Sequence, residues 1–290
     1  MTSKQRTWIA IALTTYFFIL VLLGIFEPNG LLTDPAITSS DFLTERPHVT
    51  LLDRWIIIVP SSTIIVYLLG VQILLIGFKM IQNQERTWGA SLVFWGIGTI
   101  LAGTSYQGLG YELKCAGNNV CQFTDWFELA YLFSTAISIS LMGFAFAKQF
   151  TTGRSQKRLK RYSEIALIAY TILLLLGSIL EIQFLVSYEL FTLFFMPLFV
   201  IFFVLNLRRY QRQKDDLNRN FVILWVLFLF VNVAYYAYYL PGFTQTLYET
   251  SDIWFSANDV LHVGLIGWFG YFSLFVQPKL RMSDTIELSY

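Results

Sequence analysis

Polar and ionisable side chains gather at the ends of three apolar stretches of the sequence. They are Tyr106, Gln107, Glu112, Asp125, Glu128, Asp259 and His262. Asp125 and Glu128 are three residues apart, so they share one face of a helix. The same spacing places Asp259 and His262 together on another helix. An imidazole beside carboxylates can relay a proton or complete a metal site, so proton transfer and metal binding are the chemistries open to this set.

His262 is the main candidate for catalysis. It would lie about one turn inside the stretch Asp259–Val276, where an ionisable side chain is costly and usually faces the interior of a helix bundle. One hypothesis makes His262 a catalytic base, with Glu128 and Asp259 as catalytic partners or, if a metal is bound, as its oxygen ligands. The other is a neutral, buried His262 that hydrogen-bonds to one carboxylate. The identity of any metal or cofactor stays open.

Candidate ligand-binding residues accompany this set. They are Tyr106, Gln107, Glu112, Asp125 and Tyr235. The acidic residues also have a purely structural interpretation. Asp125 followed by Glu128 resembles a capping box, in which the N-cap and N3 side chains bond to each other's backbone N–H. Ser256 followed by Asp259 has the same spacing. Capping alone would explain these acids, so both interpretations stay open at this point.

Several enzyme and cofactor motifs are absent from the sequence. It contains no G-x-S-x-G, Walker A or HExxH pattern. The only two histidines are His48 and His262, which excludes a site built from two or three histidine ligands near one another on a helix. No lysine lies in the middle of an apolar stretch, which argues against a retinal Schiff base.

The order of a serine-bearing segment, an acidic segment and a final histidine segment is similar to that of the seven-helix membrane hydrolases, which include alkaline ceramidases and adiponectin receptors. The pattern of that family pairs Ser-x3-His with H-x3-H on the last helix and binds zinc through three histidines. Here Leu109 follows Ser105 at that spacing, and Ile266 follows His262. The likeness therefore covers a few residues and lacks the zinc ligands, which puts zinc hydrolysis of that type in doubt.

The composition indicates a membrane protein. Hydrophobic residues make up 56% of the chain and charged residues 13%, whereas about a quarter of a soluble domain is charged. A membrane helix needs roughly 20 mainly apolar residues. Eight stretches qualify: Trp8–Phe26, Trp55–Phe78, Trp88–Gly108, Trp126–Ala147, Ser163–Ile182, Leu190–Leu207, Phe221–Leu240 and Asp259–Val276. The sequence predicts one all-α integral membrane domain over residues 1–290, either a single eight-helix bundle or one helix beside a seven-helix core.

The charge distribution predicts how this bundle is oriented. With both termini in the cytoplasm, all but three of the 20 basic residues fall on the cytoplasmic side. The three exceptions are Arg46, Arg54 and Lys114. Such a bias is what the positive-inside rule measures. The protein is expected in a plasma membrane. Its compact loops without trafficking signals favour the bacterial inner membrane.

The same topology places Cys115 and Cys121 in an extracytoplasmic loop. Because that compartment is oxidising, the pair predicts a disulfide rather than two free thiols. The basic loop 148–162 falls on the cytoplasmic side, where it predicts contact with anionic lipid rather than with nucleic acid. Membrane lipids are therefore the expected partners, and protein partners stay unknown.

The favoured function is a binding or sensing module for a small molecule or lipid, or a partner subunit. Its outward-facing polar pocket would lie between Trp88–Gly108, Trp126–Ala147 and Asp259–Val276. One alternative is a membrane-embedded, hydrolase-like enzyme that modifies lipids with His262 and either Glu128 or Asp259. A second alternative is a proton- or cation-coupled carrier. Whether the chain is an enzyme stays open.

Overall fold

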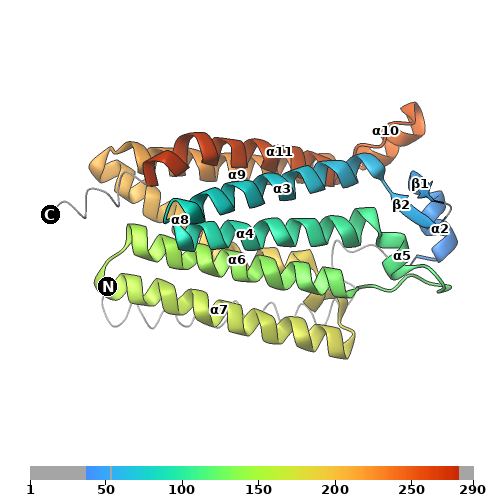
Figure 1. Cartoon of the computed structure of the whole chain (residues 1–290), viewed down its shortest axis with the longest axis horizontal. Coiled ribbons are helices and arrows are strands. Elements are labelled where there is room, and N and C mark those ends of the chain that lie inside the picture. Colours follow the sequence, from blue (N-terminus) through green and yellow to red (C-terminus); the bar gives the residue numbers. More distant parts are fainter. Residues whose placement is uncertain (1–36, 53, 281–290) are drawn as a thin grey trace.

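The computed structural model describes residues 37–52 and 54–280. The predicted membrane segment Trp8–Phe26 lies outside the described residues, as do both ends of the chain. Long helices run side by side along the longest axis of the molecule (Figure 1). They are α3 (Pro60–Gln82), α4 (Arg86–Ala102), α6 (Trp126–Phe150), α7 (Gly153–Leu180), α8 (Tyr188–Gln213), α9 (Asp216–Tyr239) and α11 (Ala257–Tyr271).

Six of the described helices are long and apolar enough to cross a membrane. They are α3, α6, α7, α8, α9 and the continuous helix Ala257–Leu280, which begins with α11. Two π-helical segments continue the helices that precede them: η1 (Gly103–Gly108) follows α4, and η3 (Phe272–Val276) follows α11. The chain is thus an all-α protein with six candidate membrane-spanning helices in its described part.

Short elements gather at one end of the bundle. Figure 1 shows α2 (Ser39–Thr44), β1 (His48–Leu51), β2 (Trp55–Ile58), α5 (Gly110–Lys114) and α10 (Phe243–Ser251) at the same end. Strands β1 and β2 form an antiparallel hairpin. Because this end also carries the cysteine pair, we call it the disulfide end. The 3-10 helix η2 (Gln183–Val186) joins α7 to α8.

Helix boundaries differ from the sequence-based ones at two places. The first residues of the predicted segment Trp55–Phe78 form strand β2, and Pro60 then begins α3 at its first position. Proline fits there because the first helical N–H needs no intrahelical acceptor, so Pro60 starts the helix and does not bend it. The predicted basic loop 148–162 is mostly helical, since α7 already begins at Gly153.

Glycines bring α3 and α4 into close contact. A Cβ added at Gly89 would lie 2.6 Å from the carbonyl oxygen of Gly77. One added at Gly96 would lie 2.9 Å from the carbonyl oxygen of Gly70. These distances are too short for any side chain, so the two backbones approach as small residues permit in membrane helices.

Aromatic side chains fill the centre of the bundle. Phe146 of α6 is fully buried. Its ring lies 4.1 Å from that of Phe202 and 5.2 Å from that of Phe221 between centroids, and Trp88 and Trp225 complete its surroundings. Aromatic pairs at such distances add roughly 0.5–1.5 kcal/mol each beyond the area they bury. These contacts hold the C-terminal part of α6 against α4, α8 and α9.

Candidate functional site

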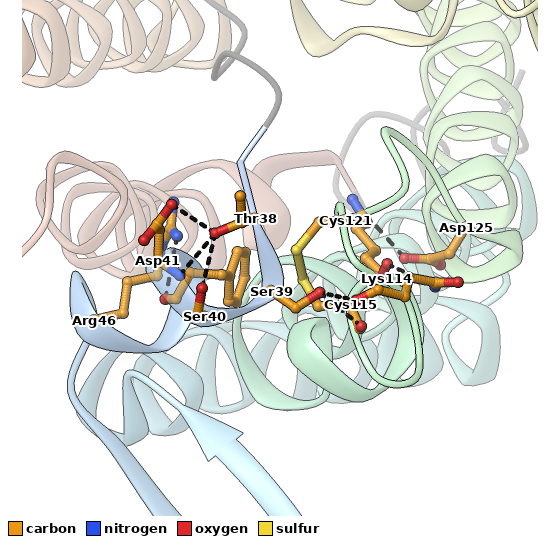
Figure 2. Close-up of a disulfide and its surroundings, with 11 residues drawn as sticks. Thr38, Ser39, Ser40, Asp41, Arg46, Lys114, Cys115, Cys121 and Asp125 are labelled. Carbon is orange, nitrogen blue, oxygen red and sulfur yellow. Dashed lines mark hydrogen bonds and ion pairs between the residues drawn. A yellow bond between two sulfur atoms is a disulfide. The ribbon is translucent and has the colours of Figure 1, made fainter.

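The predicted disulfide joins Cys115 and Cys121, with an S–S distance of 2.02 Å. Its loop is bonded to the chain that precedes β1. Ser39 Oγ donates to the carbonyl oxygens of Cys115 at 2.9 Å and of Asn118 at 2.5 Å, and the Cys121 N–H donates to the carbonyl oxygen of Ile37 at 3.0 Å. Figure 2 shows the disulfide beside Ser39, with Lys114 on the adjoining turn. The disulfide thus stabilises the end of α5, from which Lys114 extends.

Lys114 reaches the first turn of α6. Its ammonium group lies 2.5 Å from Glu128 Oε2 and 3.9 Å from Asp125 Oδ2 (the latter contact is drawn in Figure 2). The ammonium also lies 4.6 Å from the centre of the Tyr106 ring, a cation–π contact. The side chains of Lys114, Asp125 and Glu128 are about nine-tenths buried or more. Buried charges of opposite sign are thereby paired.

The second oxygen of Glu128 is also occupied. It accepts a hydrogen bond from the hydroxyl group of Tyr106, which η1 positions. Asp125 caps α6: its Oδ1 accepts from the N–H groups of Phe127 at 2.7 Å and Glu128 at 3.0 Å. Its Oδ2 accepts from Ser105 Oγ at 2.5 Å. We call these connected side chains the Glu128 network, comprising Ser105, Tyr106, Lys114, Asp125 and Glu128.

The Glu128 network has the features of a structural ion cluster. Both oxygens of Glu128 have charged or hydroxyl partners, and the capping oxygen of Asp125 is used by backbone N–H groups. A carboxylate whose oxygens are already bonded to an ammonium and a hydroxyl is poorly prepared to remove a substrate proton or to bind a metal ion. Asp125 is the predicted N-cap, but Glu128 does not close a capping box, because its carboxylate turns toward Lys114.

The remaining ligand-binding candidates lie elsewhere at the disulfide end. Glu112 accepts a hydrogen bond from the Ile56 N–H at 3.0 Å, which attaches α5 to β2. Gln107 is buried in η1, and its Oε1 has no hydrogen-bond partner within the described residues. Tyr235 stacks on Tyr239 within α9, with ring centroids 5.8 Å apart. No described hydrogen bond connects these three residues to the Glu128 network.

Asp259 lies at the start of α11, and it forms the capping box that the sequence predicts. Its Oδ2 accepts from the Ser256 N–H at 2.6 Å, while Ser256 Oγ accepts from the Asp259 N–H at 3.2 Å. The same Oδ2 accepts from Ser62 Oγ of α3 at 2.7 Å. Asp259 is completely buried, yet its other oxygen, Oδ1, has no partner among residues 37–52 and 54–280.

His262 follows Asp259 by one helical turn. Its Nδ1 is buried and, like Asp259 Oδ1, has no hydrogen-bond partner in the described part of the chain. A buried polar atom without a protein partner is explained by a water, an ion or a ligand, and in Asp259 and His262 two ionisable side chains one turn apart carry such atoms. We call Ser62, Ser256, Asp259 and His262 the α11 site. The hydroxyl group of Tyr238, which donates to the Phe255 carbonyl at 2.8 Å, stands beside the entry to α11.

The predicted polar set is therefore divided into two groups. No hydrogen bond or ion pair links Glu128 to Asp259 or His262 in the described residues. Sequence reasoning did not assign Lys114 or Ser62 to either group. Lys114 is the one basic residue of the predicted loop that contains Cys115, and that lone cation among acids was the available signal. Ser62 gave none, because only packing of α3 against α11 brings it to Asp259.

Within the described residues, no group of three or more His, Cys, Asp or Glu side chains is arranged to hold a metal ion. Comparison with protein-family models, with curated proteins and with solved structures finds no match for this chain.

Proposed function

We propose that this chain is a multi-pass protein of the plasma membrane, specifically the bacterial inner membrane. The disulfide end lies on the extracytoplasmic side. The charges support this orientation. Among the described residues, Arg46, Arg54 and Lys114 are the basic residues at the disulfide end, and the others lie on segments at the opposite end. An oxidising exterior also suits the Cys115–Cys121 disulfide. Both termini then lie in the cytoplasm.

The full count of membrane spans in this proposal is eight. To the six helices named above we add α4 with η1, which run on from each other over 17 and 6 residues, and the apolar stretch Trp8–Phe26. A rod of this combined length, rising about 1.5 Å per residue, covers the roughly 30 Å of the hydrocarbon core. The stretch Trp8–Phe26 is counted as a span because its sequence is apolar and long enough to cross the hydrocarbon core.

The proposed function is the binding or sensing of a small molecule at the α11 site, alone or as a partner subunit. The observation that carries it is the pair of buried, unpartnered atoms Asp259 Oδ1 and His262 Nδ1. A purely structural capping box needs Asp259 Oδ2 and leaves no reason to bury a second carboxylate oxygen without a bond, which costs on the order of 1–3 kcal/mol. A bound ligand would remove that cost.

The chemistry of the α11 site defines the ligand class. A carboxylate oxygen accepts hydrogen bonds, and the imidazole nitrogen of His262 accepts or donates according to its tautomer. A small molecule with N–H or O–H groups, in particular a primary amine whose charge the carboxylate would balance, satisfies both atoms. Ser62 Oγ and the Ser256 backbone hold Asp259 Oδ2, so the unpartnered oxygen keeps a fixed position for such a ligand.

The test is thermal unfolding of the purified full chain against a panel of ammonium, short primary alkylamines and small polyols. A ligand at 100 times its Kd stabilises the folded state by about 2.7 kcal/mol, so at least one compound should raise the Tm of the wild type. Asp259→Asn and His262→Gln should remove that rise. Asp252→Asn, which changes an exposed acid after α10, should keep it.

Two results would refute this proposal. One is a panel in which no compound raises the Tm of the wild type. The other is a rise that persists undiminished in both Asp259→Asn and His262→Gln. Loss of the rise in the Asp252→Asn control as well would also count against it, because the effect would then reflect surface charge and not the α11 site.

A lipid-modifying enzyme is the second candidate, favoured by His262 Nδ1, which has no partner among the described residues and follows the Asp259 carboxylate by one helical turn. Since Lys114 and Tyr106 occupy both oxygens of Glu128, the catalytic set would reduce to His262 as base and Asp259 as its orienting partner. Hydrolysis of fluorogenic lipid esters and amides tests this candidate. Turnover that survives in His262→Gln, or no turnover in the wild type, would exclude it. A proton- or cation-coupled carrier is a third candidate, and uptake into proteoliposomes tests it.

The start of α7 is proposed to contact anionic lipid. Helix α7 begins within the basic run, and Arg154, Lys157 and Arg158 are exposed along its first turns. On the cytoplasmic side, each such residue near an anionic surface contributes about 1 kcal/mol of attraction. Labelling of single cysteines placed in this run from the cytoplasmic side only would support the orientation, and labelling from outside would contradict it.

A further inference from the structure

A groove lies on the surface of the bundle between α3 and the continuous helix Ala257–Leu280. This α3–α11 groove has a volume of about 560 Å³, within the range of roughly 300–1,000 Å³ typical of small-ligand sites. Its lining comes from α3 and from the end of α11 with η3. The lining includes Leu68, Val71, Leu75, Lys79, Gly270 and Leu274. The groove is thus mainly apolar, with one cation.

Glycine explains why the groove exists. A Cβ added at Gly270 would meet no atom of the described residues within 4 Å, and the same holds at Gly267 one turn earlier. Gly264, in contrast, packs against Val231 at 2.8 Å from an added Cβ. The glycines of this helix therefore have two roles: Gly264 permits helix contact, whereas Gly270 leaves space unfilled. Gln72 Nε2 donates to the Ile266 carbonyl at 3.1 Å and fixes the distance between the two walls.

The position of the cation along the groove is specific. Leu68 and Lys79 are eleven positions apart on α3, which corresponds to about 16 Å of helix. That length equals about half of the roughly 30 Å hydrocarbon core, the depth of one leaflet. Lys79 lies in the last turn of α3, at the end opposite the disulfide, and is exposed. An apolar channel one leaflet deep with an ammonium at its headgroup end matches a single anionic lipid.

We propose that the α3–α11 groove binds one anionic phospholipid from the leaflet opposite the disulfide end. One acyl chain lies along Leu68, Val71 and Leu75, against the space that Gly270 leaves open. The phosphate group accepts charge-assisted hydrogen bonds from the Lys79 ammonium. Leu274, 70% exposed, borders the groove on the η3 side. This inference rests on the groove and not on the ligand of the α11 site, so either can fail without the other.

Native mass spectrometry of the full chain released from lipid nanodiscs tests the proposal. The probes are dioleoyl phosphatidylglycerol and dioleoyl phosphatidylcholine at equal amounts. The wild type should retain one phosphatidylglycerol in preference to phosphatidylcholine. Lys79→Ala should lower its retention about tenfold, because the phosphate loses its charge-assisted hydrogen bonds, whereas Lys79→Arg should preserve it. Arg208→Ala, an exposed cation at the same end on α8, is the matched control and should leave retention unchanged.

A second variant tests the apolar part of the groove. Gly270→Leu puts a side chain into the groove that Gly270 lines, at a position where an added Cβ meets no atom of the described residues within 4 Å. It should therefore unfold at the wild-type temperature and still lose bound phosphatidylglycerol. Equal losses in Lys79→Ala and Arg208→Ala would overturn the proposal, since the lipid would then be held by general surface charge. Undiminished retention in Gly270→Leu would overturn it as well.

Cross-linking identifies the occupant directly. The two natural cysteines form a disulfide, so Ser273→Cys provides one thiol in the groove for a photoactivatable maleimide. In membranes that contain phosphatidylglycerol, the product should be a lipid adduct. Cross-linking to residues 8–26 of the same chain, or to a second copy, would replace the lipid by a helix as the occupant and overturn the proposal.

Discussion

Glu128 and Asp259 are both acidic, both are buried near the disulfide end, and each lies three residues after the N-cap of its helix. Their surroundings differ. Both oxygens of Glu128 have partners, one of them an ammonium, whereas Asp259 Oδ1 has no partner and Asp259 no bonded cation among the described residues. The same sequence pattern thus yields a satisfied ion cluster on α6 and an unsatisfied carboxylate on α11. The bonds of Glu128 stabilise the folded protein and so account for its burial. The buried Asp259 Oδ1 makes no such bond, so a contribution to stability does not account for its burial.

Replacing Glu128 by Ala should cause the largest loss of stability. It leaves the Lys114 ammonium buried beside Tyr106 without its closest anion, and breaking a buried ion pair typically costs about 3–5 kcal/mol. Denaturant-induced unfolding in detergent, followed by tryptophan fluorescence, measures this cost. Arg219→Gln, which removes the exposed Arg219–Asp216 pair alone, is the control and should change stability little. If Glu128→Ala were as mild as that control, the Glu128 network would not be structural.

Opening the disulfide should have the next largest effect on the same network. The chain-entropy relation for a loop with a separation of 6 residues gives about 2 kcal/mol for Cys115→Ser with Cys121→Ser. Because Lys114 precedes Cys115 directly, the Lys114–Glu128 ion pair should weaken at the same time. A double-mutant cycle with Glu128→Ala measures this coupling. Strictly additive losses would show that the disulfide and the ion pair act independently.

Removing the hydroxyl group of Tyr106 should have a smaller effect. Tyr106→Phe takes one hydrogen bond from Glu128 but leaves the Lys114 contact and the ring in place, so we expect a loss of about 1 kcal/mol. Tyr238→Phe, which removes a hydroxyl bonded to the Phe255 carbonyl, is the matched control at the other site. Unfolding measurements on both compare the hydroxyl groups directly. A loss from Tyr106→Phe as large as that from Glu128→Ala would contradict the ranking.

Much of the fold was predictable from the sequence because membrane helices follow from local composition. Long apolar stretches and the Ser256–Asp259 capping box both depend on residues close together in the chain. The disulfide was also predictable, since its cysteines lie in one loop. The β1–β2 hairpin was not, because Trp55–Ile58 is as apolar as the helix that follows it.

The division of the polar residues into two groups was beyond sequence reasoning. Whether Glu128 meets His262 or Lys114 depends on how α6 packs against its neighbours, and similar depth in a membrane does not distinguish these cases. The contact of Ser62 with Asp259 joins residues 197 positions apart. Its only cause is the packing of α3 on α11, which no local pattern encodes.

Asp259→Asn should give the smallest change in the free energy of unfolding. The sign of that change distinguishes the α11 site from the Glu128 network. The asparagine oxygen can accept the bonds that Ser62 and Ser256 now donate to Oδ2, so the helix cap survives. The substitution also removes a buried charge that has no bonded cation in the described residues, and burying such a charge is unfavourable. Asp259→Asn should therefore leave the free energy of unfolding unchanged or raise it by up to about 1 kcal/mol, as substitutions at strained functional sites often do. The matched change Glu128→Gln should lower it, because Lys114 then loses its charge partner. A loss in Asp259→Asn equal to that in Glu128→Gln would mean that the α11 carboxylate is as structural as the α6 one, and the motive for a ligand there would disappear.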